Sequence, residues 1–220
     1  FAQPSGQRPQ AQAARVEPDA VRVDGTLGDA AWNLATPVTN FTQREPSEGE
    51  PARDRMEVRF LYDEGALYVG ARMSSSQPVQ ASLTRRDDPG QAEMIAIALD
   101  TYLDRRTAYG FGVTAAGVRV DLFFPTDNQD RVEFDFDPVW QARTVVTEDG
   151  WTAEMRIPFS QLRFNSRDKN VWGLNIMRYI LSAEEEVHWS LVERTQSGWA
   201  LRFGDLSGLD DITPLLRLEV

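Results

Sequence analysis

Residues 139–157 read VWQARTVVTEDGWTAEMRI and contain a complete β-hairpin signal. Apolar and polar residues alternate from Val139 to Thr147 and again from Trp151 to Ile157, and this period of two is typical of strands that bury one face. Between the two runs lies Glu148-Asp149-Gly150, whose Asp-Gly pair favours a tight turn between antiparallel strands. The segment therefore predicts two paired strands joined by a short turn.

The same pattern recurs on both sides of this hairpin. Paired runs with short turns between them lie at 56–62 and 66–73, 107–114 and 118–124, and 171–181 and 186–193, and single runs lie at 93–100, 200–203 and 215–220. Helical signals are confined to 29–34 and 159–162. About nine to eleven strands with one or two short helical turns predict an all-β fold, an antiparallel β-sandwich of the jelly-roll or immunoglobulin-like type.

The first twenty residues, FAQPSGQRPQAQAARVEPDA, have a different composition, because Gln, Pro and Ala predominate and no apolar period is present. This predicts an extended low-complexity tail over 1–20, followed by one domain over 21–220. If the tail is ordered, either the domain's own surface or a partner protein must hold it. Cleavage of a signal peptide after Ala2 would leave a Gln-initial chain, which makes export a hypothesis.

The composition excludes several classes of function. The chain has 34 Asp and Glu against 23 Lys and Arg, and its net charge of −11 argues against nucleic acid as a partner, because phosphate binding needs a basic stripe. With no Cys, it has no thiol nucleophile, disulfide, Cys-type zinc site or iron–sulfur cluster. No run approaches the ~20 consecutive apolar residues of a membrane-spanning helix.

Several segments resemble blocks of the family 9 carbohydrate-binding module superfamily. These blocks are VDGTLGDAAW at 23–32, YDEGALYVG at 62–70 and DGWTAEMRIP at 149–158. Three more runs are similar to those of a bacterial subgroup in which this domain precedes an outer-membrane-type β-barrel of unknown function: LDTYLDRRTAY at 99–109, FSQLRF at 159–164 and GDLSGL at 204–209. The resemblance implies a β-sandwich that often carries calcium and, in the best-understood members, holds sugar-chain ends between tryptophans.

The six tryptophans are the first candidates for a sugar site, because aromatic faces stack on the apolar faces of sugars. Four of them lie in the opening motif or at alternating strand positions, where large aromatic side chains fill the core: Trp32, Trp140, Trp151 and Trp172. Trp189 and Trp199 remain as a candidate stacking pair. For Trp199, which lies in a predicted loop, exposure for binding and local packing are both open.

Residues 127–137 form a dense acidic loop. Its carboxylates are Asp127, Asp130, Glu133, Asp135 and Asp137. Calcium takes roughly six to eight oxygen ligands, so this loop predicts calcium as a structural ion. In a chain with 34 acidic residues, a solvated acidic loop is the other explanation.

A second charged group consists of Arg85-Arg86 followed by Asp87-Asp88. The planar guanidinium of an arginine can hold a sugar hydroxyl or carboxylate with two hydrogen bonds, so Arg85 and Arg86 are candidate ligand-binding residues. A structural ion network with the neighbouring acids is the alternative.

No catalytic motif is present: the chain lacks G-x-S-x-G, a P-loop and H-E-x-x-H, and the single His188 lies in a strand-like run. We therefore expect a non-catalytic binding module of an exported bacterial protein, periplasmic or at the cell surface, with carbohydrate as its ligand class. The alternative is a structural or accessory subunit that docks onto a partner protein or a membrane-protein assembly through its tail and sandwich surface.

Overall fold

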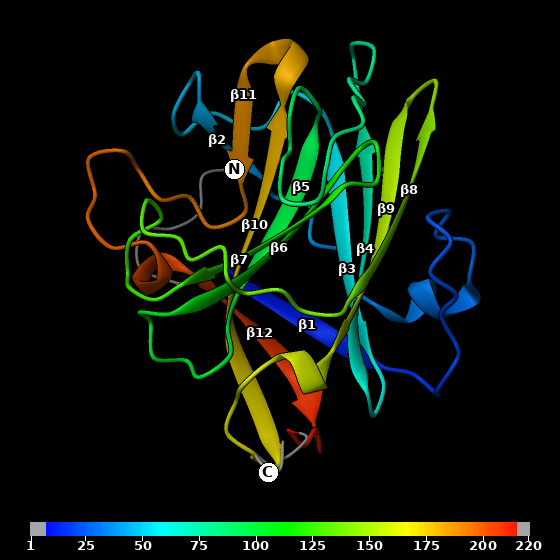
Figure 1. The fold of residues 1–220 in the computed structure, drawn as a ribbon, viewed down its shortest axis with the longest axis vertical. Helices are drawn as coiled ribbons and strands as arrows, with labels where there is room; N and C mark the ends of the chain where they lie inside the picture. The colour runs from blue at the N-terminus through cyan, green and yellow to red at the C-terminus, as the bar shows by residue number, and fades with distance from the viewer. Residues whose placement is uncertain (1–7, 215–220) are drawn as a thin grey trace.

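The computed structural model describes residues 8–214, which form the predicted all-β fold (Figure 1). The strands are β1 (Gln10–Arg15), β2 (Thr42–Glu45), β3 (Met56–Tyr62), β4 (Ala66–Ser74), β5 (Met94–Asp100), β6 (Ala108–Thr114), β7 (Arg119–Phe124), β8 (Gln141–Thr147), β9 (Gly150–Pro158), β10 (Lys169–Ile180), β11 (Glu185–His188) and β12 (Gly204–Asp210). The helical elements of the described residues are the 3-10 turns η1 (Ala30–Leu34), η2 (Phe159–Gln161), η3 (Leu181–Ala183) and η4 (Ala200–Arg202). The strand predicted at 200–203 is therefore a turn, and the one predicted at 215–220 lies outside the described residues.

The strands form one hydrogen-bonded path in the order β7-β6-β5-β10-β12-β1-β3-β4-β9-β8, with β11 on β10 and β2 on β11. Neighbours are antiparallel except at β1, which is parallel to both β12 and β3. The two ends of the path also approach each other, since the Thr144 hydroxyl of β8 donates to the carbonyl of Ala115, just after β6, over 3.0 Å. The fold is thus a nearly closed mixed sheet, where the sequence predicted two separate antiparallel sheets.

Strand β1 lies in the segment predicted to be a tail. Its residues Gln10–Gln12 pair with Asp205–Ser207 of β12, and Ala13–Arg15 pair with Phe60–Tyr62 of β3. Figure 1 shows β1 crossing obliquely between these two strands. The chain's own sheet holds this segment, so its order no longer favours docking onto a partner.

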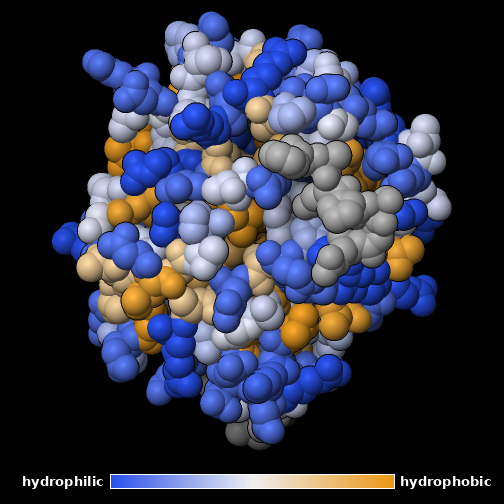
Figure 2. Space-filling view, turned by 180° about the vertical axis from the view of Figure 1, so that it is seen from behind, coloured by the Kyte–Doolittle hydropathy of each residue, from blue (hydrophilic) through white to orange (hydrophobic). Residues whose placement is uncertain are grey.

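Strand β1 connects two groups of strands, β7-β6-β5-β10-β12 on one side and β3-β4-β9-β8 on the other, and the core lies between these groups. Its largest side chains are aromatic and at most 1% exposed: Phe60, Phe111, Trp140, Trp151 and Trp172. The core positions predicted for Trp140, Trp151 and Trp172 are confirmed. Trp32 is also buried, at 4% exposure, but it lies in a separate, smaller apolar cluster with Tyr68. On the face seen in Figure 2, hydrophilic residues prevail and hydrophobic ones form small groups. No helix within residues 8–214 is long and apolar enough to cross a membrane.

Gly70 of β4 is required by the packing of the 23–32 segment. A Cβ added there would lie 2.6 Å from Leu27 Cδ2 and 2.8 Å from ring atoms of Trp32. We expect Gly70→Ala to lower the free energy of unfolding by about 1–3 kcal/mol through overpacking, measured by urea unfolding. Gly65→Ala is the matched control, because its Cβ would meet its nearest neighbour at 3.6 Å. Equal stability of the two variants would contradict this packing.

Candidate functional site

A cavity of about 240 Å³ lies on the face of β5, β6, β7 and β10 that points away from the main core. Strand register builds its floor, because Met177 pairs with Ala96, Ala96 with Gly112, and Gly112 with Val120. Side chains of paired residues lie on the same face of a sheet. These four paired residues form a row across the strands. The floor is lowest in the middle of this row, because Ala96 has only a methyl group and Gly112 has no side chain.

The walls of the cavity come from larger side chains on both sides of this row. Leu122 and Phe124 of β7 form one wall, and Met177 and Tyr179 of β10 form the other. A second glycine, Gly110, pairs with Leu122 and also lines the cavity, but the Phe124 ring lies over it, 3.0 Å from where a Cβ would stand. The result is a mainly apolar depression of the size of a small-molecule group.

A charged group borders the cavity on the side of β10. Arg44 Nη1 lies 3.3 Å from Glu186 Oε1, and the same oxygen lies 2.6 Å from Nε2 of the buried His188. Burial raises the pKa of Glu186, but hydrogen bonding and charge from His188 and Arg44 outweigh it, so the pKa lies below its usual value. Glu186 is therefore ionised at neutral pH.

Tyr179 supplies a neutral polar group beside this ion pair. It pairs with Glu186 across β10 and β11, and both residues line the cavity. Burial, and then the charge of Glu186, raise the pKa of Tyr179 above its usual value. The phenol keeps its proton and is able to donate or accept a hydrogen bond.

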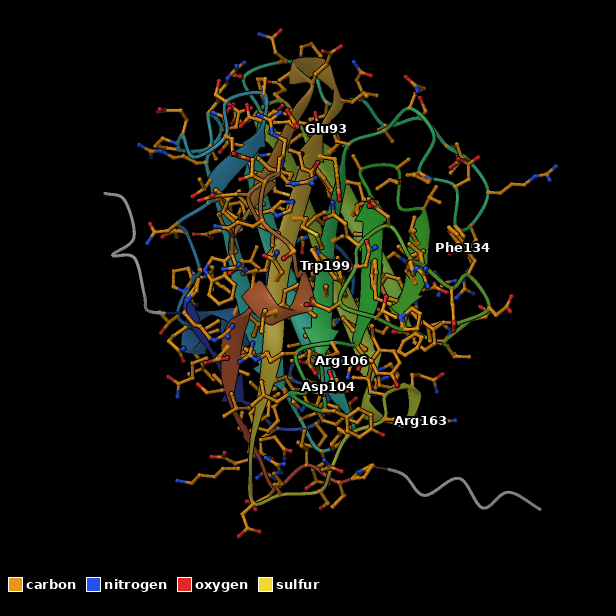
Figure 3. The ribbon with its side chains drawn as sticks, turned by 90° about the vertical axis from the view of Figure 1, so that its left-hand side faces the viewer. Glu93, Asp104, Arg106, Phe134, Arg163 and Trp199 are labelled. Carbon is orange, nitrogen blue, oxygen red and sulfur yellow. The ribbon has the colours of Figure 1, made fainter. Side chains whose placement is uncertain are left out.

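The loop after β7 and the segment before η4 form the remaining border, with Gln129, Asp130, Val132 and Trp199 lining the cavity. Figure 3 shows Trp199 in front of the strands, on the segment that leads into η4. Its ring packs against Phe124 at a centroid distance of 4.2 Å, and it is only 3% exposed. The site thus combines an apolar floor with an ion pair, a phenol, an amide and a carboxylate at its edges.

The structure does not support the predicted stacking pair. Trp189 and Trp199 are 4% and 3% exposed, so neither ring is free to cover a sugar face at the surface. They also line different cavities. Trp189 borders a more polar cavity of about 340 Å³ together with Gln10, Gln12 and Asn40. For Trp199, local packing is the outcome, although the residue is among those that line the candidate site.

The two predicted arginines are not at the cavity. Arg86 Nη2 lies 2.9 Å from the buried carboxylate of Asp121 and 2.7 Å from Asp137. Burial lowers the pKa of Arg86, but these carboxylates raise it above its usual value. Arg86 therefore belongs to the structural ion network that was the alternative, while Arg85 is exposed. Neither residue is among those that line the two cavities.

The predicted calcium loop does not converge on a common point. Asp127 accepts hydrogen bonds from the backbone N–H groups of Trp199 (2.6 Å) and Leu201 (3.1 Å), and Asp137 pairs with Arg86. Three other predicted ligands are exposed: Asp130, Glu133 and Asp135. Within residues 8–214, no group of three or more His, Asp or Glu is placed to hold a metal ion. Calcium at this loop is therefore unsupported, because its carboxylates face different partners.

Sequence reasoning missed most of the cavity residues. The alternating glycines at 110 and 112 were a signal, because glycine inside a strand often marks a close approach of a ligand or another backbone. Arg44, Tyr179 and Glu186 gave no such signal. They lie on three strands that only the β2–β11–β10 pairing brings together.

Comparison with known proteins identifies a matching family and similar folds. The family described as "Carbohydrate family 9 binding domain-like" matches residues 23–200. A family 9 carbohydrate-binding module from Caldicellulosiruptor kristjanssonii, solved with cellotriose and with glucose, is 17% identical to this chain. The two structures have TM-scores of 0.65 and 0.66, covering 94% and 93% of this chain and 100% and 99% of theirs.

A protein from Bacteroides uniformis ATCC 8492, provisionally described as carbohydrate-binding, has a TM-score of 0.70 at 12% identity. The match covers 92% of this chain and all of that one. At these identities the solved structures show a likeness of fold. No curated protein matches the sequence.

Proposed function

Because the chain belongs to the carbohydrate family 9 binding domain-like family, we propose that it is a non-catalytic carbohydrate-binding domain whose site is the cavity over β5, β6, β7 and β10. The observation that carries the proposal is the amphipathic lining of this cavity. A pyranose ring has apolar C–H faces and a rim of hydroxyl groups. An apolar floor with polar groups at its edges matches both features.

The small residues of the floor allow a ring to approach the sheet closely. Ala96 and Gly112 would lie under the ring, and the Phe124 and Met177 side chains would flank it. Hydroxyl groups at the ring edge would form hydrogen bonds with the Arg44–Glu186 pair on one side of the cavity. On the other side, they would form hydrogen bonds with Gln129 and Asp130.

The state of Glu186 supports binding over hydrolysis. A glycosidase needs one protonated carboxyl group with a raised pKa to act as general acid. Glu186 has a pKa below its usual value, and its oxygens are already held by Arg44 and His188. Such a carboxylate is suited to accept hydrogen bonds from hydroxyl groups.

Titration calorimetry with cellotriose tests this proposal. We expect the chain to bind cellotriose and Gly112→Ala to bind about ten-fold more weakly, because the added methyl group would occupy the floor next to Met94 Sδ, 3.2 Å away. Gly65→Ala, outside the cavity, is the control and should keep full affinity. Failure of the unsubstituted chain to bind glucose or glucans would contradict the proposed function. Unchanged binding by Gly112→Ala would contradict the site.

Export remains part of this proposal, supported by the absence of cysteine from all 220 residues. Docking of a tail onto a partner protein is not proposed, because β1 is built into the domain's own sheet.

A further inference from the structure

The more polar cavity of about 340 Å³ lies between β1 and the segment 36–40, and it shares no lining residue with the cavity over β5, β6, β7 and β10. We propose that it is a second, weaker saccharide-binding site, which does not depend on the first. The domain would then hold a glycan at two separate places.

The pairing of β1 opens this cavity. Gln10–Gln12 pair with β12, but from Ala13 onward β1 pairs with β3 instead. The earlier part of β3 is paired with the segment 36–40, because Val38 and Val58 exchange two backbone hydrogen bonds of 2.8 and 3.0 Å. The cavity therefore lies between two segments that pair with different strands, Gln10–Gln12 with β12 and 36–40 with β3.

The inner surface of this cavity is apolar. Ala11, Val38 and Trp189 line it and are 6%, 9% and 4% exposed. Trp189 packs against the backbone of β12, since a Cβ added at Gly204 would lie 2.6 Å from its ring. The area that these side chains offer to the C–H groups of a pyranose ring is small, which is one reason to expect weak binding.

The rim is polar. Six side chains with amide or hydroxyl groups line it: Gln10, Gln12, Thr36, Thr39, Asn40 and Ser207. Gln10 donates to the Asp205 carboxylate over 2.9 Å, and Ser207 donates to the Ala11 carbonyl over 3.2 Å. The other four are exposed and make no side-chain hydrogen bond within residues 8–214, so they are free to bind a ligand.

Among residues 8–214, no charged side chain lines this cavity, although 26% of the residues in the chain are charged. Anionic ligands need Arg or Lys donors, and cationic ones need carboxylates or open aromatic faces, so the lining favours an uncharged ligand. Amide and hydroxyl side chains both donate and accept hydrogen bonds, as the hydroxyl groups of a sugar do.

The placement of the rim groups favours a sugar over an extended peptide, which is also uncharged. The polar groups of a peptide follow the line of its backbone. Here Gln10, Gln12 and Ser207 lie on one side of the apolar surface, and the residues of 36–40 lie on the other. This arrangement matches a ring with hydroxyl groups on its circumference.

Amide chemical shifts of the 15N-labelled full chain, titrated with cellotriose, test the inference. We expect the amides of 10–12 and 38–40 to shift with their own dissociation constant, weaker than that of the amides around Gly112. Gln12→Ala combined with Asn40→Ala should weaken this binding at least about five-fold, the factor expected for two lost neutral hydrogen bonds. Gln77→Ala combined with Asn165→Ala removes exposed side chains of the same kinds outside both cavities and should leave it unchanged.

Gly112→Ala separates the two sites. It should weaken the binding seen around position 112 and leave that seen at 10–12 and 38–40 within about two-fold, because the two sets of lining residues are separate. If cellotriose shifts only the amides around Gly112, the second site is wrong and the proposed function stands. If it shifts only those of 10–12 and 38–40, the second site is supported and the cavity chosen for the proposed function is wrong.

Three further outcomes would overturn the inference. Shifts at 10–12 and 38–40 that survive Gln12→Ala and Asn40→Ala unchanged would mean that the rim does not bind the sugar. Shifts there with an uncharged tripeptide, acetyl-trialanine amide, and none with cellotriose would mean that the cavity binds peptide. If cellotriose shifts no amide at all, both this inference and the proposed function are wrong.

Discussion

Replacing Glu154 by alanine is expected to lower the free energy of unfolding by about 4 kcal/mol, at the upper end of what single substitutions do. Glu154 lies in β9 and is fully buried. Hydrogen bonds to a buried charged group contribute about 1.5–3 kcal/mol each, and donors left without a partner add a desolvation cost. Removing one carboxylate here removes the acceptor of several donors at once.

The donors all come from the segment 23–32. The backbone N–H groups of Asp24 (2.8 Å) and Gly25 (2.7 Å) donate to Oε2 of Glu154. The backbone N–H of Leu27 (3.2 Å) and the indole N–H of Trp32 (3.0 Å) donate to Oε1. With this acceptor gone, the segment loses what holds it on the outer face of β9 and β4.

Urea unfolding followed by tryptophan fluorescence measures the effect. Glu154→Gln should show an intermediate loss, because its amide keeps one acceptor oxygen but turns N–H groups toward two of the donors. Glu148→Ala, at an exposed position in the same hairpin, is the control and should stay within about 0.5 kcal/mol of the parent. A loss below about 1 kcal/mol for Glu154→Ala would mean that the carboxylate does not organise the segment.

Glu154 also shows why the all-β part of the predicted fold could be found from the sequence. Two of the blocks that carry the family resemblance, at 23–32 and 149–158, are in direct contact through this residue. The 139–157 hairpin forms as predicted, with Thr147 opposite Gly150. Alternation of large apolar residues is a local signal, and the strands that show it are the ones that sequence reasoning found.

Strands β1 and β12 could not be found in this way. Their sequences, QAQAAR and GDLSGLD, are rich in Ala, Gln, Gly and Asp, which have low strand propensity. Close packing between the two strands requires the glycine at position 208, because a Cβ there would lie 2.5 Å from the carbonyl oxygen of Ala13. The parallel pairing that makes the sheet mixed therefore depends on close approach between distant segments, which no local pattern reveals.

The candidate site was predictable only in part for the same reason. Trp199 and Asp130 were singled out from composition and loop position, and both line the cavity. The roles expected of them, exposed stacking and metal binding, required side-chain directions that a sequence does not contain. Asp127 illustrates this, because its carboxylate accepts a hydrogen bond from the backbone N–H of Trp199. Within residues 8–214 it does not belong to any group of acidic or histidine side chains that could hold a metal ion.

Breaking the buried ion pair between Arg178 and Glu93 is the second change with a large expected effect. Both side chains are fully buried, and Arg178 Nη2 lies 3.2 Å from Glu93 Oε2. The same nitrogen donates to the Ser74 carbonyl over 2.9 Å, and the Trp151 indole N–H donates to Glu93 over 3.1 Å. Figure 3 places Glu93 toward the upper end of the molecule.

The pair is incompletely satisfied, which decides what each substitution does. Arg178 Nε and Nη1 and Glu93 Oε1 have no hydrogen-bond partner within residues 8–214. Burial lowers the pKa of Arg178 below its usual value despite the opposing charge of Glu93, so desolvation of the guanidinium is not fully repaid. Removing both charges should therefore cost little, whereas removing one leaves the other charge buried alone.

Arg178→Met and Glu93→Gln should each lower the free energy of unfolding by about 3–5 kcal/mol. The double variant should lose less than either single one, because Met fills the space of the arginine stem and Gln still accepts from Trp151. An exposed pair, Arg15 and Glu64, 4.0 Å apart, provides the control cycle, with an expected coupling of about 0–1 kcal/mol. Additive losses at 93 and 178 would show that the two charges do not depend on each other. A coupling of several kcal/mol would show that the protein is more stable with both buried charges, or with neither, than with one of them alone.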